Sequence, residues 1–573
     1  MPLLSLVTFL PIVGALVVAA LPERAAKASA LAVSVLALLA SIPLWFAFDA
    51  GPDVQGFQLV EKMDWIPAFG VSYHVGIDGV SLLLILLTTL LTPIIVLAGF
   101  SGVETKHRAY FALMLALEGA MIGTFVALDT FLFYMFWELV LIPMYFLIGI
   151  WGGARRLYAA VKLFVYTVAG SLLMLVALIG LYVFHHQVEG TWTTDLSRLL
   201  ALDIPYDTQM WMFACFALAF AIKVPMFPVH TWLPDAHVEA PTGGSVVLAG
   251  VMLKMGTYGF YRFAMPLFPD ATMAFGPLLI GLSVIGIVYG ALVAMVQDDV
   301  KKLVAYSSVS HLGFVMLGLF ALNQEGVAGS IYQMLGHGVS TGALFLLVGV
   351  LYERRHTRKI VDYGGLTKVV PVFAVVFMIV TLSSIGLPGT NGFVGEFMIL
   401  LGAFQYAPIP TTIATTGVIF GATYMLWMFQ RVMFGPLTNH ANQNLKDLNV
   451  REMVYLAPLI VLIFVMGVYP QPFLDRINPS VNAFVTRMEA RFDGTPYASA
   501  ASAPGWIKGY TGSAPVAAPA HAHGEAAHEA PAIEAPATEV PATEAPAADA
   551  AAVPTTDHDA PSHGAPAAAE HGE

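Results

Sequence analysis

Two lysines, Lys223 and Lys254, lie inside stretches that are otherwise apolar enough to sit in a lipid bilayer. A lysine near the centre of a bilayer costs about 3 kcal/mol on insertion scales. Lys223 is followed by Pro225 and Pro228, which remove backbone hydrogen bonds beside the charge. Interrupted backbone at membrane depth persists only where protein buries it or water lines it. Two such lysines therefore indicate a path for an ion or a proton.

Five further ionisable side chains fall inside apolar stretches, namely Glu118, Glu138, His311, His337 and Glu396. Any one of them could be a satisfied structural group, and a single buried histidine is as often a hydrogen-bonded core residue as a relay. Seven such groups together argue against a purely structural role. Burial and a nearby opposite charge change the proton affinity of lysine and of carboxylates, so a buried Glu–Lys pair can act as a switch. Because histidine titrates near neutrality, the set suits proton transfer.

A second group of side chains superficially resembles a metal-binding cluster: His230, Asp235, His237 and Glu239. Their spacing fits no zinc pattern that we can identify. Pro241 follows at a position that suits the first turn of the next helix. We therefore favour a polar turn that leads into that helix, and we expect no metal site.

Composition places the chain in a membrane. Of its 573 residues, 58% are hydrophobic and 11% are charged, against roughly 25% charged residues in a soluble domain. The first apolar stretch lacks a charged n-region and a small-residue cleavage site, so we expect it to be retained. The single cysteine, Cys215, excludes an internal disulfide and an iron–sulfur cluster, which needs about four thiolates. Phosphate-binding and dinucleotide-binding glycine motifs are also missing, so we expect this chain to bind no cofactor.

The formal charge of -12 reflects the C-terminal segment. Ten acidic residues and no Lys or Arg follow Lys508, so the preceding part of the chain is close to neutral. From about Ser499 onward the composition is dominated by Ala, Pro, Glu and His, with repeats such as PATEVPATEAPA. A segment of this kind cannot bury enough apolar surface to offset the entropy of ordering. We expect residues 499–573 to be a disordered tail, whose histidines could bind metal loosely but more simply keep the tail solvated.

Apolar stretches of about 20 residues, the length that spans a bilayer, predict an all-α polytopic protein with about fourteen transmembrane helices. They fall near residues 3–21, 29–48, 78–100, 109–128, 130–150, 158–184, 210–229, 241–265, 272–296, 302–321, 328–351, 371–405, 410–432 and 453–471.

The distribution of Lys and Arg supports this count. Alternate loops, beginning after the first helix, carry sixteen of these residues, including the pairs Arg155–Arg156, Lys301–Lys302 and Arg354–Arg355. The opposite loops carry three, Lys62, Arg198 and Arg262, and the segment after the last helix adds four. By the positive-inside rule, the basic loops lie in the cytoplasm and both termini lie outside.

Two of the predicted helices are interrupted, which suggests an internal repeat. The seventh helix is broken at Lys223-Val-Pro225, and the twelfth at Ser383–Gly392. They are five helices apart, so equivalent units would cross the membrane in opposite directions, and paired broken helices of inverted repeats point to the working site of a transporter. We predict five parts: three N-terminal helices (1–108), inverted units of helices 4–8 (109–265) and helices 9–13 (272–432), a last transmembrane helix (453–475) and the tail (499–573).

Four long motifs resemble the antiporter-like, proton-translocating subunits of respiratory complex I. They are FWELVLIPMYFLIGIWG, HTWLPDAHVEAPTGGSVVLAGVMLKMGTYGFYR, DDVKKLVAYSSVSHLGF and GLPGTNGFVGEF, and together they span predicted helices 5 to 12. Sister subunits L and N tend to carry lysine where this chain has Glu396. The long lateral helix of subunit L is also incompatible with an Ala/Pro-rich tail.

The resemblance implies a role for each matching position. Glu138 and Lys223 would be the charge pair that gates protonation, and Lys254 the central carrier. His311 and His337 would form the bridge between repeats, and Glu396 the terminal site toward the outer face. Glu118 belongs to no matching motif, so it is at most an accessory group.

The resemblance also implies an activity and partners. The chain would move protons outward across a bacterial inner membrane as a subunit of NADH:quinone oxidoreductase, while partner chains hold NADH, FMN, iron–sulfur clusters and quinone. Its membrane partners would include the sister antiporter-like chains L and N. One alternative is a subunit of a multisubunit Na+/H+ antiporter or a membrane-bound hydrogenase, and another is a quinone-binding or purely structural subunit.

Overall fold

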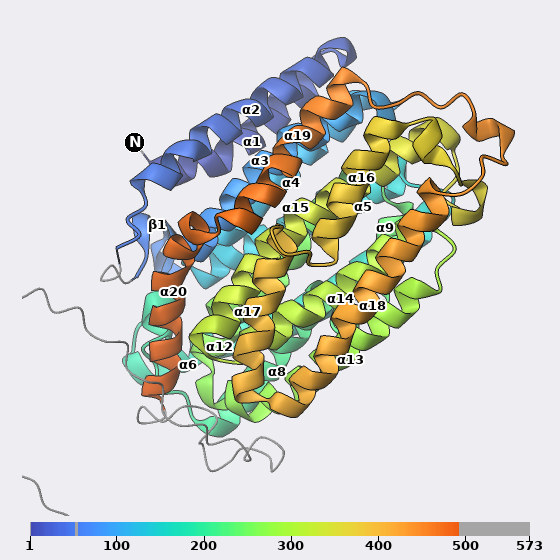
Figure 1. The fold of residues 1–573 in the computed structure, drawn as a ribbon. Coiled ribbons are helices and arrows are strands. Elements are labelled where there is room, and N and C mark those ends of the chain that lie inside the picture. Colours follow the sequence, from blue (N-terminus) through green and yellow to red (C-terminus); the bar gives the residue numbers. More distant parts are fainter. Residues whose placement is uncertain (1, 52–55, 492–573) are drawn as a thin grey trace, which may run out of the picture. The chain divides into compact units, whose positions relative to one another are not determined.

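The computed structural model describes residues 2–51 and 56–491, all of which belong to one compact unit. The predicted tail, 499–573, lies outside the described residues. Within the described residues, eleven helices are long and apolar enough to cross a membrane, in keeping with the membrane class predicted from composition (Figure 1). They are α1 (Leu3–Ala20), α2 (Glu23–Ala47), α3 (Gly79–Gly102), α4 (His107–Val126), α5 (Thr130–Trp151), α6 (Arg156–Glu189), α13 (Pro269–Met295), α14 (Val300–Leu319), α15 (Gln324–Arg355), α18 (Pro408–Met433) and α19 (Val450–Val468).

Three further apolar stretches are divided into shorter helices. Both predicted interruptions are present, because α8 ends at Lys223 and α16 ends at Ser384. The stretch 241–265, predicted as one regular helix, contains two π-helical turns, Leu248–Met252 and Phe260–Ala264. The pieces are α8 (Tyr206–Lys223), α9 (Trp232–Glu239), α10 (Thr242–Val247), α11 (Leu253–Gly259), α12 (Met265–Leu267), α16 (Pro371–Ser384) and α17 (Asn391–Tyr406).

A small antiparallel sheet departs from the all-α prediction. Strands β1 (Gln58–Ile66) and β2 (Val71–Ile77) form a hairpin in the segment that we expected to be a loop. The connecting turn, Pro67–Phe69, ends at Gly70, whose φ of 64° suits glycine. Strand β1 is largely exposed, and β2 is buried but only 7 residues long, so neither strand carries the long apolar pattern that identifies the helices.

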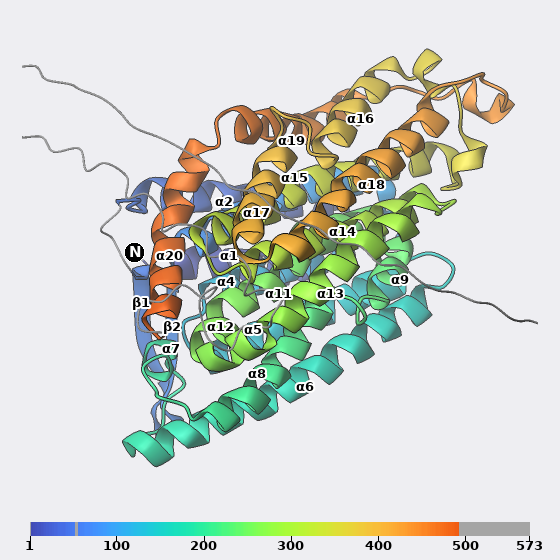
Figure 2. The same cartoon turned by 60° about the horizontal axis from the view of Figure 1, so that its bottom comes forward.

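The C-terminal part also differs from the prediction. The last long apolar helix ends at Val468 instead of near residue 475, and Pro470 precedes a separate helix, α20 (Gln471–Ala490). Short helix α7 (Leu196–Leu199) lies between α6 and α8. Figures 1 and 2 both show β1 and α20 at one end of the bundle, with α9 and the segment that links α18 to α19 at the other. The basic segment 353–359, which begins in the last turn of α15, belongs to the end that carries α9, because Arg358 donates to the carbonyl of Val238 in α9.

Short polar side chains determine where several helices begin. Asp78 accepts the backbone N–H of Ser81 at the start of α3, and Asp129 accepts those of Phe131 and Leu132 at the start of α5. Asp299 and Asn323 cap α14 and α15 in the same way. Each cap satisfies an N–H that has no partner within its own helix.

Helix α15 is the centre of the bundle, since its membrane-length span is completely buried. Glycine allows close packing there. A Cβ on Gly338 would lie 2.7 Å from Leu87 of α3 and 2.9 Å from the carbonyl of Gly250, inside the first π-helical turn. The backbone of α15 therefore contacts the segment that carries Lys254 more closely than a larger side chain would permit.

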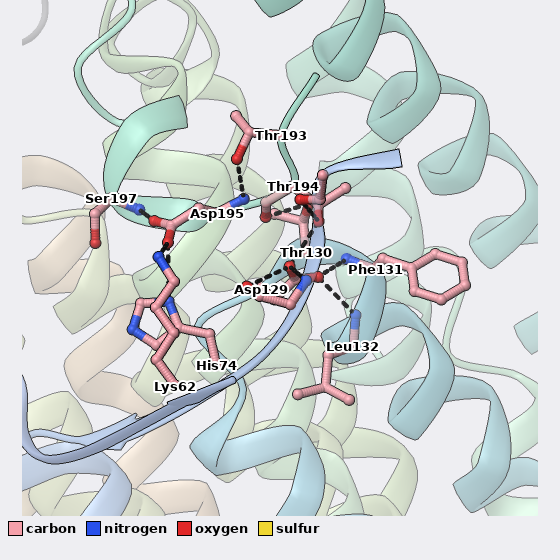
Figure 3. A network of polar contacts seen from close by, with 12 residues as sticks. Lys62, His74, Asp129, Thr130, Phe131, Leu132, Thr193, Thr194, Asp195 and Ser197 are labelled. Atoms are coloured by element: carbon pink, nitrogen blue, oxygen red, sulfur yellow. Dashed lines mark hydrogen bonds and ion pairs between the residues drawn. The ribbon is translucent and has the colours of Figure 1, made fainter. Parts of the chain in front are cut away.

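At the end that carries the hairpin, a buried polar network joins β1 and β2 to α5 and α7 (Figure 3). Oδ2 of Asp195 accepts a hydrogen bond from the ammonium of Lys62 at 2.6 Å and lies 3.0 Å from Nδ1 of His74. Asp129 accepts the hydroxyl of Thr194 at 2.6 Å. Burial opposes the charged form of Asp195, but the hydrogen bonds from His74 and Lys62 outweigh it, so the pKa of Asp195 lies below its ordinary value.

The lowered pKa of Asp195 predicts a pH-dependent anchor for the hairpin. A carboxyl group whose pKa is lower in the folded than in the unfolded state stabilises the fold at pH values above its unfolded pKa, about 3.9. This stabilisation is lost as the pH falls from the unfolded pKa through the folded pKa. We expect Asp195→Asn to lower the free energy of local opening of the hairpin at pH 7 by about 2 kcal/mol. This change raises the equilibrium constant for opening about 30-fold. Hydrogen exchange of the amides of residues 58–77 measures this change, and the difference from wild type should shrink below about pH 4. Exposed Asp207, changed to Asn, is the control; a pH-independent difference would contradict the prediction.

Candidate functional site

Lys223 is the last residue of α8, and its side chain is buried. The helix ends there because Pro225 cannot continue it. The backbone groups that the break releases find partners: the indole N–H of Trp232 donates to the carbonyl of Ile222, and the N–H of Met226 to the carbonyl of Ala221. A lysine at a helix C-terminus also has a favourable interaction with the helix dipole.

Glu138 lies opposite this break, on α5, and is half-buried. Among the ion pairs of the described residues there is no contact within 4.0 Å between Glu138 and Lys223, although the two charges interact electrostatically. The ammonium of Lys223 instead lies 5.1 Å from the ring centre of Trp137, the neighbour of Glu138. The predicted charge pair is therefore open in this structure, and an aromatic face stabilises the lysine.

Lys254 is completely buried in α11, directly after the first π-helical turn. Its ammonium donates to the carbonyl of Ala249, inside that turn, and lies 2.7 Å from Nδ1 of His337. A π-helical turn disrupts the regular pattern of backbone hydrogen bonds and is frequent at functional sites. Here it leaves a carbonyl available to the lysine side chain.

The contacts between ionisable groups continue from His337 on α15 to α14 and α17. The rings of His337 and His311 have centroids 5.8 Å apart. Nδ1 of His311 lies 2.8 Å from Oε1 of Glu396, and the amide of Gln333 donates to the same oxygen at 3.0 Å. Four of the residues predicted from sequence, Lys254, His337, His311 and Glu396, thus form one buried series of ionisable groups. Helices α11, α15, α14 and α17 contribute one residue each.

The break between α16 and α17 positions Glu396. Asn391 donates to the carbonyl of Gly336 at 2.9 Å and accepts the hydroxyl of Ser383, which ties both sides of the break to α15. Gly386, inside the break, has a φ of 73°, and a Cβ there would lie 3.2 Å from Oε2 of Glu396. The interrupted backbone therefore lies directly against the carboxylate.

Glu118 lies outside this series. It is completely buried on α4 and approaches Thr92 of α3. Within the described ranges, neither carboxylate oxygen has a hydrogen-bond partner of normal geometry. The structure thus brings together four of the seven predicted residues, places Glu138 and Lys223 as a separate neighbouring set, and leaves Glu118 apart.

His237 is a buried histidine that the sequence analysis did not place among the candidate proton-transfer groups. The segment that we interpreted as a polar turn is helix α9, and no group of three metal-ligating side chains occurs in the described residues. His237 is completely buried, stacks on Phe345 and interacts electrostatically with Lys301 and Lys254. The histidine was visible in the motif WLPDAHVEAP, but its position beside the lysines depends on tertiary packing.

A cavity of about 500 Å³ lies at the end of the bundle that carries α9. Its lining includes Glu239, Lys301, Glu353 and Arg358. The ammonium of Lys301 donates to the carbonyl of Ala240 at 2.5 Å, at the end of α9. This cavity lies beside the end of α9, the helix that carries His237, although His237 itself does not line it.

The part of the chain that carries this site matches a known protein family. Residues 127–421 match the family described as NADH:quinone oxidoreductase/Mrp antiporter, transmembrane. The matched range contains six of the seven predicted residues and leaves out Glu118. The chain is 47% identical to NADH-quinone oxidoreductase subunit M of Rhodobacter capsulatus, over 85% of this chain and 97% of that one. It is 44% identical to NADH-ubiquinone oxidoreductase chain 4 of Marchantia polymorpha, over 86% and 98% of the two chains.

Solved structures agree with these relatives. A chain of respiratory complex I from Thermus thermophilus with bound NADH has a TM-score of 0.77 at 34% identity, covering 85% of this chain and all of that chain. A chain of the Mrp complex from a Dietzia species has a TM-score of 0.73 at 23% identity, covering 84% of this chain and 52% of that chain. The second similarity concerns the fold alone. The resemblance inferred from the four motifs is thereby confirmed.

Proposed function

Because this chain belongs to the NADH:quinone oxidoreductase/Mrp antiporter transmembrane family, we propose that it is the proton-translocating subunit through which partner chains couple NADH:quinone electron transfer to proton movement. The observation that carries this proposal is the buried series from Lys254 to Glu396, with contacts of 2.7 Å at one end and 2.8 Å at the other. A scaffold has no need for four ionisable groups in its core, where each unpaired charge is costly.

The predicted residues other than Glu118 each have a place in this proposal. Protons approach through the cavity lined by Lys301 and Glu239 and reach Lys254 by way of His237. Lys254 passes a proton to His337. His311 carries it on to Glu396, and Glu396 releases it toward the outer face. Glu138 and Lys223 act as the gate: when Lys223 moves from Trp137 to Glu138, the field on Lys254 changes.

The finer topology is also part of the proposal. Three further segments each cross the membrane once and add three crossings to the eleven long helices. They are α8, the segment that contains α10 to α12, and α16 together with α17. The fourteen crossings then include two inverted units, in which α8 and α16–α17 are the equivalent broken helices. The basic loops lie in the cytoplasm of a bacterial cell and both termini lie outside. The partners of this chain include the sister antiporter-like subunits L and N, and other partner chains hold the cofactors.

Substitution of Glu396 tests the function. Glu396→Gln preserves a group that hydrogen-bonds to His311 and Gln333 but cannot titrate, so we expect NADH-driven proton translocation to fall at least roughly 10-fold. Glu396→Asp retains the carboxyl and should retain much of the activity. The measurement is acidification of inverted membrane vesicles that contain the assembled complex, with an uncoupler as the control. Equal translocation by the Gln variant would rule out an essential titrating role.

The same vesicles separate this function from its nearest alternative. A Na+/H+ antiporter subunit of the same fold would move sodium in exchange for protons, without NADH. We expect NADH-dependent proton translocation that persists in sodium-free buffer. Sodium-dependent translocation without NADH would favour the antiporter.

A further inference from the structure

Ser384, the last residue of α16, lies between two small cavities. Each has a volume of about 10 Å³, roughly the smallest space that holds one water molecule. His337, Gln333 and Ser384 line the first cavity, and Ser384, Glu396 and Tyr424 line the second. His311 lines both. The two cavities therefore flank the step from His337 to Glu396.

Three buried polar atoms around the first cavity lack a protein partner in the described part of the chain: Nε2 of His337, Oε1 of Gln333 and the hydroxyl of Ser384. The other ring nitrogen of His337 faces Lys254, and the amide nitrogen of Gln333 is bound to Glu396. A buried polar atom without a partner typically costs about 1–3 kcal/mol. Since a buried water usually makes about three hydrogen bonds, one water in this cavity has the partners it needs.

We propose that each cavity binds one water molecule and that Ser384 links the two waters into a second proton route, parallel to His311, from His337 to Glu396. This inference rests on the proposed function, because it concerns the same transferred proton. The serine is suited to the task because a hydroxyl can donate one hydrogen bond while it accepts another. Two residues, His311 and Ser384, line both cavities, and the hydroxyl of Ser384 has no protein partner among the described residues.

The transfer balances at every atom. Lys254 gives a proton to Nδ1 of His337, and His337 releases the proton on Nε2 to the first water. That water gives one of its protons to Oγ of Ser384, which passes its own hydroxyl proton to the second water. The second water protonates the carboxylate of Glu396. Every intermediate carrier ends with the number of protons with which it began, and one proton has moved from Lys254 to Glu396.

A double-mutant cycle of Ser384→Ala and His311→Gln separates parallel routes from a single series. If the routes carry similar flux, removing either one lowers NADH-driven proton translocation about two-fold. Removing both should lower it by roughly the 100-fold or more that a positioned proton-transfer group contributes. The loss in the double variant then far exceeds the product of the single losses. Ser384→Thr keeps the hydroxyl, so in the His311→Gln background translocation should be close to that of the His311→Gln single variant and well above that of the Ser384→Ala double variant.

Controls keep the result specific. Ser308→Ala removes another buried hydroxyl, which bonds its own helix at the carbonyl of Val304, and should leave translocation unchanged in both backgrounds. Native gels establish that every variant assembles. A double variant no worse than His311→Gln, or a His311→Gln variant that is already inactive, would overturn the parallel route while leaving the Glu396 test of the function intact.

A direct observation of the waters is independent of mutant stability. A high-resolution structure of the wild-type assembled complex should contain one ordered water in each cavity beside Ser384. Dry cavities would contradict the proposal even if the kinetic cycle supported it.

Discussion

Replacing Lys254 with methionine is expected to stop proton translocation while the complex still assembles. The methionine fills a similar volume, but His337 loses the group that lies 2.7 Å from its Nδ1, and no other buried cation reaches the start of the series among the described contacts. We expect a loss of at least roughly 100-fold, the scale of a positioned proton-transfer group. NADH-driven acidification of vesicles measures translocation, and native gels measure assembly.

The arginine variant shows whether charge alone is enough. Lys254→Arg keeps a cation that can bond the carbonyl of Ala249, but guanidinium does not release its proton in proteins. We therefore expect Lys254→Arg to be nearly as defective as Lys254→Met. Substantial activity of the arginine variant would mean that Lys254 acts by its field and that protons pass it by another path.

Glu138→Gln and Lys223→Met, made separately and together, should show strong non-additivity. Removing either partner leaves the other charge buried without compensation, which costs several kcal/mol. Each single variant should lower translocation roughly 10-fold or more, and the double variant should be no worse than the more defective single variant. The coupling energy expected for members of one network is 0.5–3 kcal/mol.

The geometry sharpens the interpretation of this cycle. Because Nζ of Lys223 lies more than 4.0 Å from the carboxylate oxygens of Glu138 and faces Trp137 here, a positive result shows that the two residues act as one unit although they form no ion pair in this structure. Exposed Glu189, changed to Gln, controls for a general loss of charge. Additive losses from Glu138→Gln and Lys223→Met would identify two independent residues and exclude the gating model.

Local chemistry explains why so much of the membrane part could be predicted. The lengths of apolar stretches are set by bilayer thickness, and proline and glycine act on the backbone at the positions where they occur. The ends of α8 and α16 therefore fall within the predicted interruptions. The hairpin and the amphipathic helix α20 were missed because short or half-buried elements carry no comparable signal.

The sequence by itself determined the membrane class, the places where two helices break and the identities of the residues on the buried path. Only the tertiary structure decided which of them meet. Lys254 and His337 are 83 residues apart, and their contact depends on how closely α15 packs against the first π-helical turn through Gly338. Packing also separates Lys223 from Glu138, isolates Glu118 and adds His237, Gln333 and Ser384. The rotation of each helix about its axis is set by contacts with distant segments, and hydrophobic periodicity does not encode it where a helix is buried on every side.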